Sequence, residues 1–379
     1  MSKTMKIFLV CNSLSHGGAE RVGAVLANGF VERGHEVYVV TDTHEDIVYQ
    51  LSHQVQVIPF SKSKTNKFMK WGRALYNTRV ALKRYKPDVV IGIMQLCSFV
   101  SRIASIGLDI PVVMTEHSAF EWVESLPRPW FLKFSRKYMN WMYPCVTVLT
   151  EPDKQFIGNK LKNVVVMHNP LTFESYEGEL KKEKLILSAG RLTDWRYKGW
   201  DTLVYSWARI ADKFPDWKIC IAGTGAESSK QYIIQLMKEN GIEDRVEFLG
   251  HCKNMLELYR RASIFFLSSR SEGMPMVVLE AMSQGCACVA TDYKGRTKEI
   301  INSENCGILC QPEDDKALAE GLERMITDKE YRESVQRNSI ERSKDFSVPR
   351  IVQEWESFIE SLCVHSKRSG EMAELRTER

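Results

Sequence analysis

The chain alternates short apolar runs with helical patterns along most of its length, and no other feature constrains its fold as strongly. Apolar runs bounded by turn residues are typical of buried strands, and helical segments between them favour parallel strands joined by crossover helices. The sequence therefore predicts an α/β fold with doubly wound parallel sheets. The expected strands are 6–11, 35–41, 55–59, 88–93, 111–115, 145–149 and 164–168, then 185–189, 218–222, 246–249, 264–267, 286–291 and 307–310.

The strands form two series, separated by a polar connection at about residues 172–184, and this indicates two domains. The length of 379 residues agrees, because one domain typically takes roughly 100–200 residues. Polar composition near the end predicts a disordered tail after a last amphipathic helix. The expected segments are a first domain at 1–170, a second at 171–345, the helix at 346–362 and the tail at 363–379.

Composition excludes several classes of protein. No stretch approaches the roughly 18 apolar residues of a membrane-spanning helix, and the apolar run at 7–11 is too short for a signal peptide, so we expect a cytoplasmic protein. The four cysteines between 286 and 310 lack the CxxC spacing of a zinc site, and we expect them to be structural. Residues 1–170 hold 21 Lys and Arg against 13 Asp and Glu, which suggests that this half faces an anionic surface.

The stretch Ser271–Met282 has the pattern of a phosphate site. It follows the expected strand at 264–267, and Pro275 suits the first position of a helix because it has no amide hydrogen to leave unsatisfied. The free amides and the dipole of a helix N-terminus attract phosphate. Glu272 and Glu280 flank this site, and since carboxylates repel phosphate, we expect them to accept hydrogen bonds from sugar and ribose hydroxyls. The residues expected to meet the phosphates are Gly273, Met274, Met276 and Val277.

Three motifs together resemble a known family. The Glu-x7-Glu spacing, ending in Glu-Ala-Met, resembles the signature of retaining glycosyltransferases with the GT-B fold, more narrowly glycosyltransferase family 4. Gly190-Arg191-Leu192 followed by Lys198-Gly199 matches the family pattern. Gly17-Gly18-Ala19-Glu20-Arg21 resembles the opening of members that build bacterial surface polysaccharides. The resemblance covers about residues 5–362. It implies two Rossmann-like domains facing across a cleft, the first on the acceptor side and the second binding a nucleotide sugar, with the last helix crossing back to the first.

The resemblance implies roles for residues that are otherwise ambiguous. Arg191 and Lys198 would normally be read as solvated cations, but two cations near one spot suit a diphosphate whose charge grows as it leaves. Gly17 and Gly18 form either a tight strand-to-helix turn or a close approach to phosphate. His117, after the expected strand at 111–115, is either a loop histidine or a partner of a donor-sugar hydroxyl. In each case the resemblance favours the functional interpretation.

Two further positions carry weaker signals. Gly223-Thr224-Gly225 begins like a dinucleotide fingerprint, but Ser228 stands where the third glycine would be, which argues against a nicotinamide cofactor. The family often has a Gly-x-Gly turn here, and the backbone near His251 is expected to meet the nucleotide base. Asn169-Pro170 lies where the first domain ends, and a structural role there is as well supported as a functional one.

The implied reaction is transfer of a sugar, with retention, from a nucleotide-sugar donor, UDP-linked rather than GDP-linked, to a saccharide acceptor. A polyprenyl-diphosphate-linked acceptor in capsule, O-antigen or glycan assembly is expected. No Asp-x-Asp occurs, so we expect neither a metal nor another cofactor. A nucleotide-sugar epimerase of the same architecture and a non-catalytic nucleotide-sugar-binding protein remain alternatives. The expected catalytic residues are His117, Arg191, Lys198 and Glu272.

The segment from Lys62 to Lys86 holds nine Lys and Arg and no acidic residue. An apolar helical stripe within it, including Phe68 and Leu82, predicts a core-facing helix with a basic outer side. That side is either simply solvated or in contact with anionic lipid. A second basic and aromatic run at 128–138 adds to the case for a protein held on the inner face of the cytoplasmic membrane. Nucleic acid is not expected, because no recognition module accompanies the charges. The candidate contact residues are Lys67, Lys70, Trp71 and Arg73.

Overall fold

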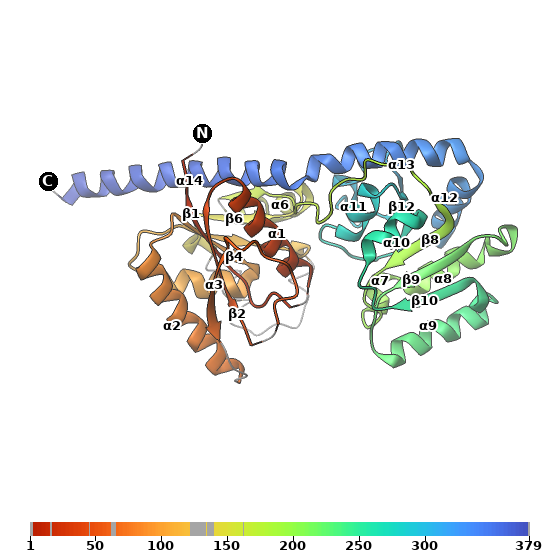
Figure 1. The fold of residues 1–379 in the computed structure, drawn as a ribbon, viewed down its shortest axis with the longest axis horizontal. Coiled ribbons are helices and arrows are strands. Elements are labelled where there is room, and N and C mark those ends of the chain that lie inside the picture. Colours follow the sequence, from red (N-terminus) through yellow and green to blue (C-terminus); the bar gives the residue numbers. More distant parts are fainter. Residues whose placement is uncertain are drawn as a thin grey trace. The chain divides into compact units, whose positions relative to one another are not determined.

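The computed structural model describes residues 3–15, 17–44, 46–61, 66–121, 134, 140–161 and 163–377, with side chains described except at 61, 67, 68, 140 and from 364 onward. The chain divides into two compact units (Figure 1). Unit 1 comprises Met1–Thr172 together with Val348–Arg379, and unit 2 comprises Phe173–Ser347. The basic and aromatic run at 128–138 lies outside the described residues, apart from Phe134.

Unit 1 is built on a seven-stranded parallel sheet with the order β3-β2-β1-β4-β5-β6-β7. Alternate residues of β1 supply two separate cores, since successive side chains of a strand point to opposite faces. Ile7 and Leu9 belong to one core, and Phe8 and Val10 to the other. The strands are β1 (Lys6–Val10), β2 (Glu36–Asp42), β3 (Gln56–Ser61), β4 (Val89–Ile93), β5 (Val112–Thr115), β6 (Cys145–Val148) and β7 (Val164–Val166).

Helices cover both faces of this sheet. On one face α1 and α14 close the first core, and on the other α2 and α3 close the second. Asn66 caps α2 by accepting the amide hydrogen of Met69 at 2.8 Å, which satisfies a donor that the first helical turn leaves free. The helices are α1 (Gly18–Glu32), α2 (Lys67–Tyr85), α3 (Met94–Ala104), α6 (Glu151–Ile157) and α14 (Val348–Thr377), with the short 3₁₀ segments Asn140–Met142 and Gly158–Lys160.

Helix α14 belongs to unit 1 although it ends the chain. Val352 and Trp355 are buried in the core that α1 closes, and each such side chain contributes roughly 1.5–3 kcal/mol by leaving water. Glu356 accepts hydrogen bonds from Arg33 Nε at 2.8 Å and from His35 Nε2 at 2.7 Å. Helix α14 continues to Thr377, through most of the segment 363–379 for which the sequence predicts a disordered tail. The residues there are mostly strong helix formers such as Lys, Arg, Glu, Met, Ala and Leu.

Unit 2 contains a six-stranded parallel sheet with the order β10-β9-β8-β11-β12-β13. Its interior strand β11 is buried at every residue, which explains why its sequence is a continuous apolar run rather than an alternating one. The strands are β8 (Glu183–Ala189), β9 (Lys218–Ala222), β10 (Val246–Gly250), β11 (Ala262–Leu267), β12 (Ala287–Thr291) and β13 (Ile308–Cys310).

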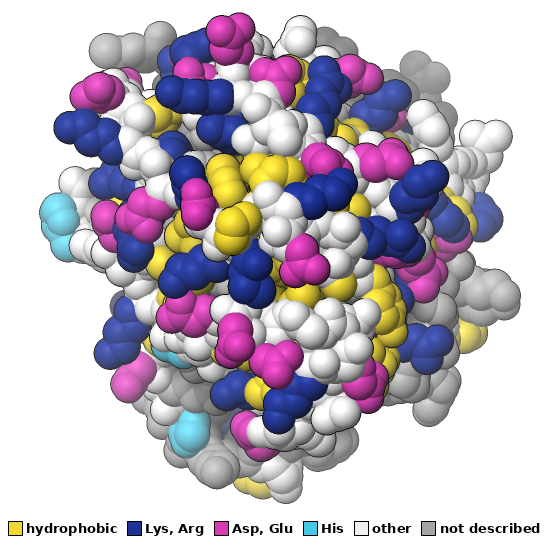
Figure 2. All heavy atoms as spheres, turned by 90° about the vertical axis from the view of Figure 1, so that its right-hand side faces the viewer, with side chains coloured by type: hydrophobic (Ala, Val, Ile, Leu, Met, Phe, Trp, Pro, Cys, Tyr) yellow, Lys and Arg dark blue, Asp and Glu magenta, His cyan; other side chains and the backbone are white. Residues whose placement is uncertain are grey.

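The helices of unit 2 pack around a core that includes Trp200 and Trp207 of α8. On its surface Lys and Arg are interspersed with Asp and Glu, as Figure 2 shows for one face. The Lys213–Glu323 pair, at 2.9 Å, is an example. The helices are α7 (Trp195–Lys198), α8 (Trp200–Ala208), α9 (Glu227–Glu239), α10 (Met255–Arg261), α11 (Met276–Ser283), α12 (Asp315–Thr327) and α13 (Lys329–Ser343), with 3₁₀ segments Ala211–Lys213, Glu243–Arg245, Thr297–Glu299 and Lys344–Phe346.

Each sheet has a point at which its strand order reverses. In unit 1 the chain leaves β1 toward β2 and returns to the other side at β4, and in unit 2 it leaves β8 toward β9 and returns at β11. Open α/β sheets bind ligands outside the carboxyl ends of their strands at such a switch point. A ligand site is therefore expected at the loops that follow β1, β4, β8 and β11.

Candidate functional site

The structure brings together two of the residues that the sequence identifies. Lys198 lies at the end of α7, which follows β8, and Glu272 lies in the loop after β11. Lys198 Nζ is 2.7 Å from Glu272 Oε1, and the two side chains are 22% and 16% exposed. Because β8 and β11 are the neighbouring strands at the switch point of unit 2, this ion pair marks the edge where a ligand is expected.

Arg270 ties together the loops that carry this pair. Its guanidinium donates to both carboxylate oxygens of Asp201, at 2.7 and 2.9 Å, and its amide donates to the Tyr197 carbonyl at 2.7 Å. The hydrogen bond to Asp201 raises the already high pKa of Arg270, so the group stays charged. A two-point bond of this kind fixes orientation as well as distance. Sequence reasoning missed both Arg270 and Asp201, because their pairing depends on the order of the strands.

Gly199 allows Lys198 to approach the end of β11. Its φ is +64°, and a Cβ atom at this position would lie 2.0 Å from the Ser268 carbonyl oxygen. The Ser268 hydroxyl in turn donates to the Lys198 carbonyl at 3.1 Å. Any other residue at 199 would therefore force the α7–α8 junction away from β11.

Arg191 is placed differently from Lys198. Its side chain is 80% exposed and pairs with Asp194 at 2.9 Å, whereas its backbone carbonyl accepts a hydrogen bond from the Trp200 indole at 3.2 Å. Gly223, after β9, has φ +152°, and a Cβ there would lie 1.9 Å from the Gly190 carbonyl oxygen. Close packing between these two loops thus accounts for the glycine at 223 without any ligand.

The loop after β11 leads into α11, which begins at Met276. Pro275 is the N-cap residue of α11 rather than its first helical residue, so the helix begins one position later than expected. Within this stretch Met274 is buried, so its side chain faces the interior, whereas Gly273, Met276 and Val277 are half-buried. Helix α11 has no side-chain cap, and its N-terminus lies at the carboxyl edge of the sheet, where the amides of a first turn can bind an anion.

Glu280 lies further along α11 and is only 5% exposed. Its Oε2 accepts a hydrogen bond at 3.0 Å from the hydroxyl of Tyr259, which is fully buried. This partner could not be identified from the sequence, because α10 and α11 are separated by β11. His251, after β10, has an exposed side chain.

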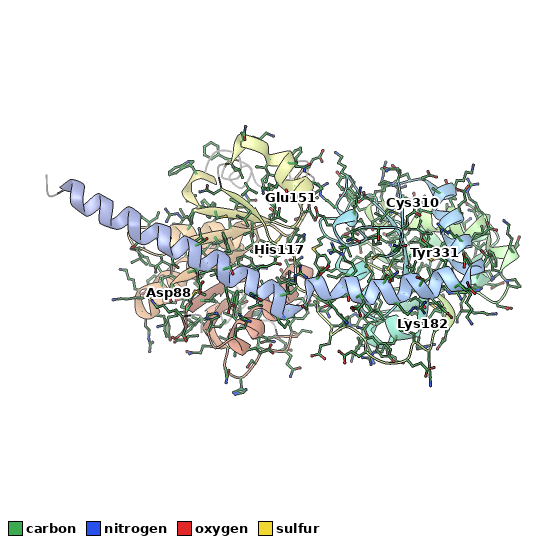
Figure 3. All side chains as sticks on the ribbon, turned by 90° about the horizontal axis from the view of Figure 1, so that it is seen from above. Asp88, His117, Glu151, Lys182, Cys310 and Tyr331 are labelled. Carbon is green, nitrogen blue, oxygen red and sulfur yellow. The ribbon has the colours of Figure 1, made fainter. Side chains whose placement is uncertain are left out.

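In unit 1 the predicted residues follow β1 and β5. Gly17 and Gly18 stand at the N-terminus of α1 and are exposed. Burial raises the pKa of Glu20, in the first turn of the same helix. His117, labelled in Figure 3, follows β5 and contacts Thr115 at 3.0 Å and Asn169 at 3.1 Å.

The residues predicted on the membrane-facing side of α2 do not share one face. Lys70 pairs with Asp42 at 2.8 Å, and Trp71 packs against the core beside Phe60, so both are turned toward the sheet. Arg73 is exposed, and the side chain of Lys67 is outside the described part. Among the described residues of α2, the exposed stripe runs along Met69, Arg73, Tyr76, Val80 and Lys83, at spacings of three and four residues.

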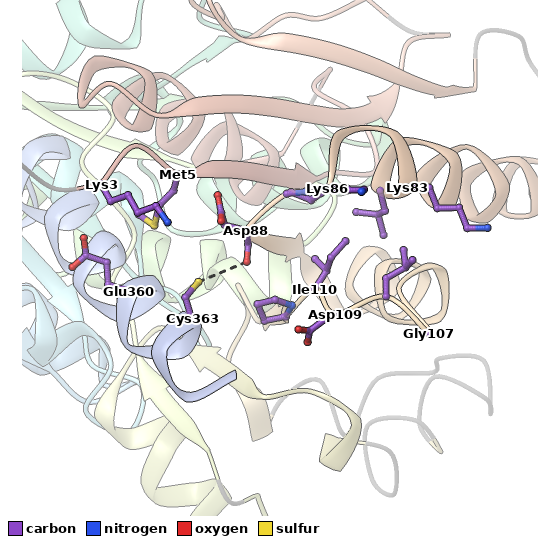
Figure 4. Close-up of a pocket in the computed structure, with 14 residues that line it drawn as sticks. Lys3, Met5, Lys83, Lys86, Asp88, Gly107, Asp109, Ile110, Glu360 and Cys363 are labelled. Carbon is purple, nitrogen blue, oxygen red and sulfur yellow. Dashed lines mark hydrogen bonds between the residues drawn. The ribbon is translucent and has the colours of Figure 1, made fainter. Parts of the chain in front are cut away.

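A cavity of about 790 Å³ lies elsewhere in unit 1, beside the segments that precede β1, β4 and β5 (Figure 4). It is at the amino ends of these strands, the opposite edge from the one where such sheets bind ligands. Its lysines are balanced by acids, so it offers no net charge to attract a phosphate. The charged lining residues are Lys3, Lys83, Lys86, Asp88, Asp109 and Glu360.

Two other features are absent from the described residues. Within them, no group of three or more His, Cys, Asp or Glu side chains is arranged to hold a metal ion. No helix among the described residues combines the length and apolar character of a membrane span. The ten cysteines are free thiols.

The chain matches two families of known proteins, one in each half. The family described as "Glycosyltransferase Family 4" matches residues 16–173, and the family described as "Glycosyl transferases group 1" matches residues 173–342. A Campylobacter jejuni relative, an alpha-1,4-N-acetyl-D-galactosaminyltransferase acting on a diNAcBac-PP-undecaprenol-linked GalNAc saccharide, is 29% identical over 93% of this chain and 97% of its own length.

Solved structures share the fold. Sucrose-phosphate synthase from Thermosynechococcus elongatus superposes with a TM-score of 0.80 at 19% identity, covering 95% of this chain and 99% of that one. Anabaena HepE in complex with UDP and glucose gives a TM-score of 0.76 at 19% identity, covering 94% of this chain and 100% of that one. The two parallel-sheet units are therefore those of the GT-B fold.

Proposed function

The chain belongs to the GT-B glycosyltransferases of the family 4 type, and from this premise we propose that it transfers a sugar, with retention, from a UDP-sugar to a polyprenyl-diphosphate-linked saccharide. The observation that carries the proposal is the Lys198–Glu272 pair at the switch point of unit 2, beside the N-terminus of α11. A cation, an acid and free helix amides together suit a ligand that has both phosphates and hydroxyls.

In the proposed mechanism the diphosphate of the donor lies at the N-terminus of α11, with Gly273, Met274, Met276 and Val277 supplying backbone contacts. Lys198 and Arg191 offset the charge that grows on the leaving nucleoside diphosphate. Glu272 accepts hydrogen bonds from the donor sugar, and Glu280, held by Tyr259, accepts them from the ribose. Arg191 must leave Asp194 to take part, and its exposure permits this.

Retention follows if the acceptor attacks on the face that the nucleoside diphosphate leaves. The sugar passes through an oxocarbenium-like state, and no side chain needs to act as a nucleophile. Gly17, Gly18 and His117 are proposed to contribute further donor contacts from unit 1, and Gly223 and His251 to lie near the nucleotide. We propose that the reaction proceeds without a metal ion.

The donor and acceptor classes rest on the relatives. UDP is favoured because the Anabaena protein of the same fold binds UDP and glucose. A lipid-linked acceptor is favoured because the Campylobacter relative is named for one. The role would then lie in bacterial surface-polysaccharide or glycan assembly, of the capsule or O-antigen kind.

A lipid-linked acceptor requires the enzyme to work at a membrane surface, and α2 offers a face for this. Its exposed stripe is basic and apolar: Tyr76 is 70% exposed, Met69 and Val80 are exposed, and Arg73 and Lys83 lie among them. The helix contains no acidic residue at all. Such a face suits an anionic lipid surface, where apolar side chains enter the headgroup region and cations remain at its border. We propose peripheral binding to the inner face of the cytoplasmic membrane.

A screen of UDP- and GDP-sugars in EDTA, without acceptor, tests the proposed donor chemistry. Thermal shift and product analysis are read together. A selective shift by one UDP-sugar, with slow release of free UDP, is the expected result. Conversion into a different UDP-sugar would instead establish an epimerase, and binding without any turnover, even after lipid-linked acceptor is added, would indicate a binding protein. Dependence of turnover on an added divalent cation would contradict the metal-free mechanism.

A further inference from the structure

His117 has a partner on each of its two ring nitrogens. Its Nε2 lies 3.0 Å from the Thr115 hydroxyl oxygen, and its Nδ1 lies 3.1 Å from the side-chain amide of Asn169. Thr115 ends β5, and Asn169 lies in the segment that follows β7. Both partners are buried and His117 is half-buried, so these contacts hold the ring from two directions.

The hydrogen bond that the Thr115 hydroxyl donates determines the tautomer of the His117 imidazole. The Thr115 hydroxyl donates to the Gly92 carbonyl at 2.9 Å, and a hydroxyl has only one proton to give. Toward His117 its oxygen can therefore only accept. The hydrogen must then be on Nε2 of His117.

The contact between Nδ1 of His117 and Asn169 allows two arrangements. When Nε2 of a neutral imidazole carries the hydrogen, Nδ1 has a lone pair and is an acceptor. The amide oxygen of Asn169 is an acceptor too, so either the ring takes a second proton or the amide turns its NH₂ group toward Nδ1. Burial lowers the pKa of His117, and this outweighs the opposing effects of the Glu116 carboxylate and the Asn169 contact. The neutral ring, with the amide turned, is the consistent arrangement.

Glu116 is the titratable neighbour whose charge acts on the ring. Its Oε1 accepts the amide hydrogen of His117 at 3.2 Å and the hydroxyl of Ser118 at 2.9 Å. These bonds occupy Oε1 of the carboxylate with the backbone and a hydroxyl.

We propose that Asn169 is a positioning residue whose amide NH₂ donates to Nδ1 of His117, holding in place the ring that Thr115 sets in its Nε2–H form and keeping it uncharged. The inference rests on the proposed function, in which His117 contacts the donor sugar. Positive charge develops on that sugar as the nucleoside diphosphate leaves, and a cationic imidazole beside it would oppose this charge. A neutral imidazole held in place does not oppose the positive charge on the sugar.

The substitution Asn169→Asp tests the polarity of this bond, since it keeps the shape of the side chain and replaces the donor with a charged acceptor. The carboxylate favours protonated His117, so the histidine pKa is expected to rise above the wild-type value. We expect kcat to fall by about tenfold with KM little changed, because the effect acts on the transition state. Histidine ¹⁵N NMR gives both the form of the ring and its pKa, with the His117→Gln variant identifying the signal.

A matched control is Asn163→Asp. Asn163 is exposed in the same unit and donates to the Pro144 carbonyl at 2.8 Å, so the added charge is the same while His117 is untouched. The pKa of His117 and kcat are expected to match the wild type in this control. If Asn169→Asp does not fold, Asn169→Ala removes the donor without adding charge. The ¹⁵N signal of Nδ1 is then expected to shift because its hydrogen bond is lost, while Thr115 still keeps the hydrogen on Nε2.

A wild-type His117 with a proton on Nδ1 at pH 7 would overturn the proposal. So would an Asn169→Asp variant whose histidine pKa and kcat equal those of the Asn163→Asp control. Failure of the proposed function has a different signature: the wild-type enzyme would release no UDP from any UDP-sugar, while the NMR signals of His117 would be unaffected.

Discussion

Lys198 Nζ lies 2.7 Å from Glu272 Oε1, although 74 residues separate the two along the chain. In this arrangement the lysine neutralises the acid that we propose for the donor sugar. A diphosphate that enters this edge competes with Glu272 for the same cation. In the proposed mechanism, binding of the nucleotide and release of Glu272 toward the sugar hydroxyls are therefore coupled by a single side chain.

This competition predicts the effect of removing the cation. Lys198→Met is expected to weaken UDP binding by about tenfold or more, because one charge-assisted contact to the diphosphate is lost. Isothermal titration with UDP measures it. Lys184→Met, which removes an exposed lysine paired with Asp216 at 2.9 Å, is the control. Equal UDP affinity in the two variants would exclude Lys198 from the phosphate site.

The Arg270–Asp201 bond predicts a cost in stability as well as in activity. Arg270→Ala leaves the largely buried Asp201 carboxylate without its two-point partner, and the free energy of unfolding is expected to fall by about 1–3 kcal/mol. Urea unfolding measures this, and KM for the donor should rise because the Lys198 loop is no longer tied to the loop after β11.

The control for Arg270 is Lys213→Ala. It breaks an exposed pair with Glu323, and exposed pairs are worth about 0–1 kcal/mol. A loss of stability no larger than that of this control would show that Arg270 does not secure the two loops.

The attachment of α14 predicts a dependence of stability on pH. Burial acts to raise the pKa of Glu356, but the hydrogen bonds from Arg33 and His35 outweigh it and lower the pKa below 4.5. A carboxyl whose pKa is lowered by folding stabilises the folded state above its unfolded pKa, and this contribution is lost as the pH falls through the folded value. Glu356→Gln is therefore expected to be destabilising at pH 7 and progressively less so below about pH 4.5.

Urea unfolding of wild type and Glu356→Gln across this pH range tests the attachment. Glu354→Gln serves as the control, because Glu354 makes only an exposed pair with Arg350 at 3.8 Å. A destabilisation by Glu356→Gln that stays constant from pH 7 into the acid range would contradict the assignment of the acid sensitivity to this carboxylate.

The exposed stripe of α2 predicts binding to anionic vesicles. The double variant Arg73→Glu, Lys83→Glu and the single variant Tyr76→Ser are each expected to reduce co-sedimentation with phosphatidylglycerol vesicles, the first strongly and in a salt-dependent way. Lys316→Glu with Lys329→Glu places the same charges on exposed sites of unit 2 and should leave binding unchanged. Equal binding by all variants, or by neutral vesicles, would argue against this face.

The elements were predictable because buried parallel strands are nearly continuous apolar runs. The expected strand 218–222 has the same limits as β9, and the other strands begin or end within a few residues of their expected limits. The residues of the site were visible in motifs at the strand ends. The partners of these residues were not visible, since the contacts of Tyr259 with Glu280 and of Arg270 with Asp201 can be predicted only when the strand order is known. On α2 the apolar stripe that packs on the core was recognised, but the pairing of Lys70 with Asp42 was not, since it depends on the place of β2 in the sheet.

The most direct measurement compares wild type with Glu272→Gln, using the donor that the screen identifies. The amide keeps the size of the side chain and removes the charge that pairs with Lys198. The affinity for UDP alone should be preserved or increased, because Lys198 no longer has an acidic partner. Release of UDP from the UDP-sugar should fall by about 100-fold or more, as expected when a charged contact to the reacting group is lost. Wild-type turnover by Glu272→Gln would contradict the assignment of this site.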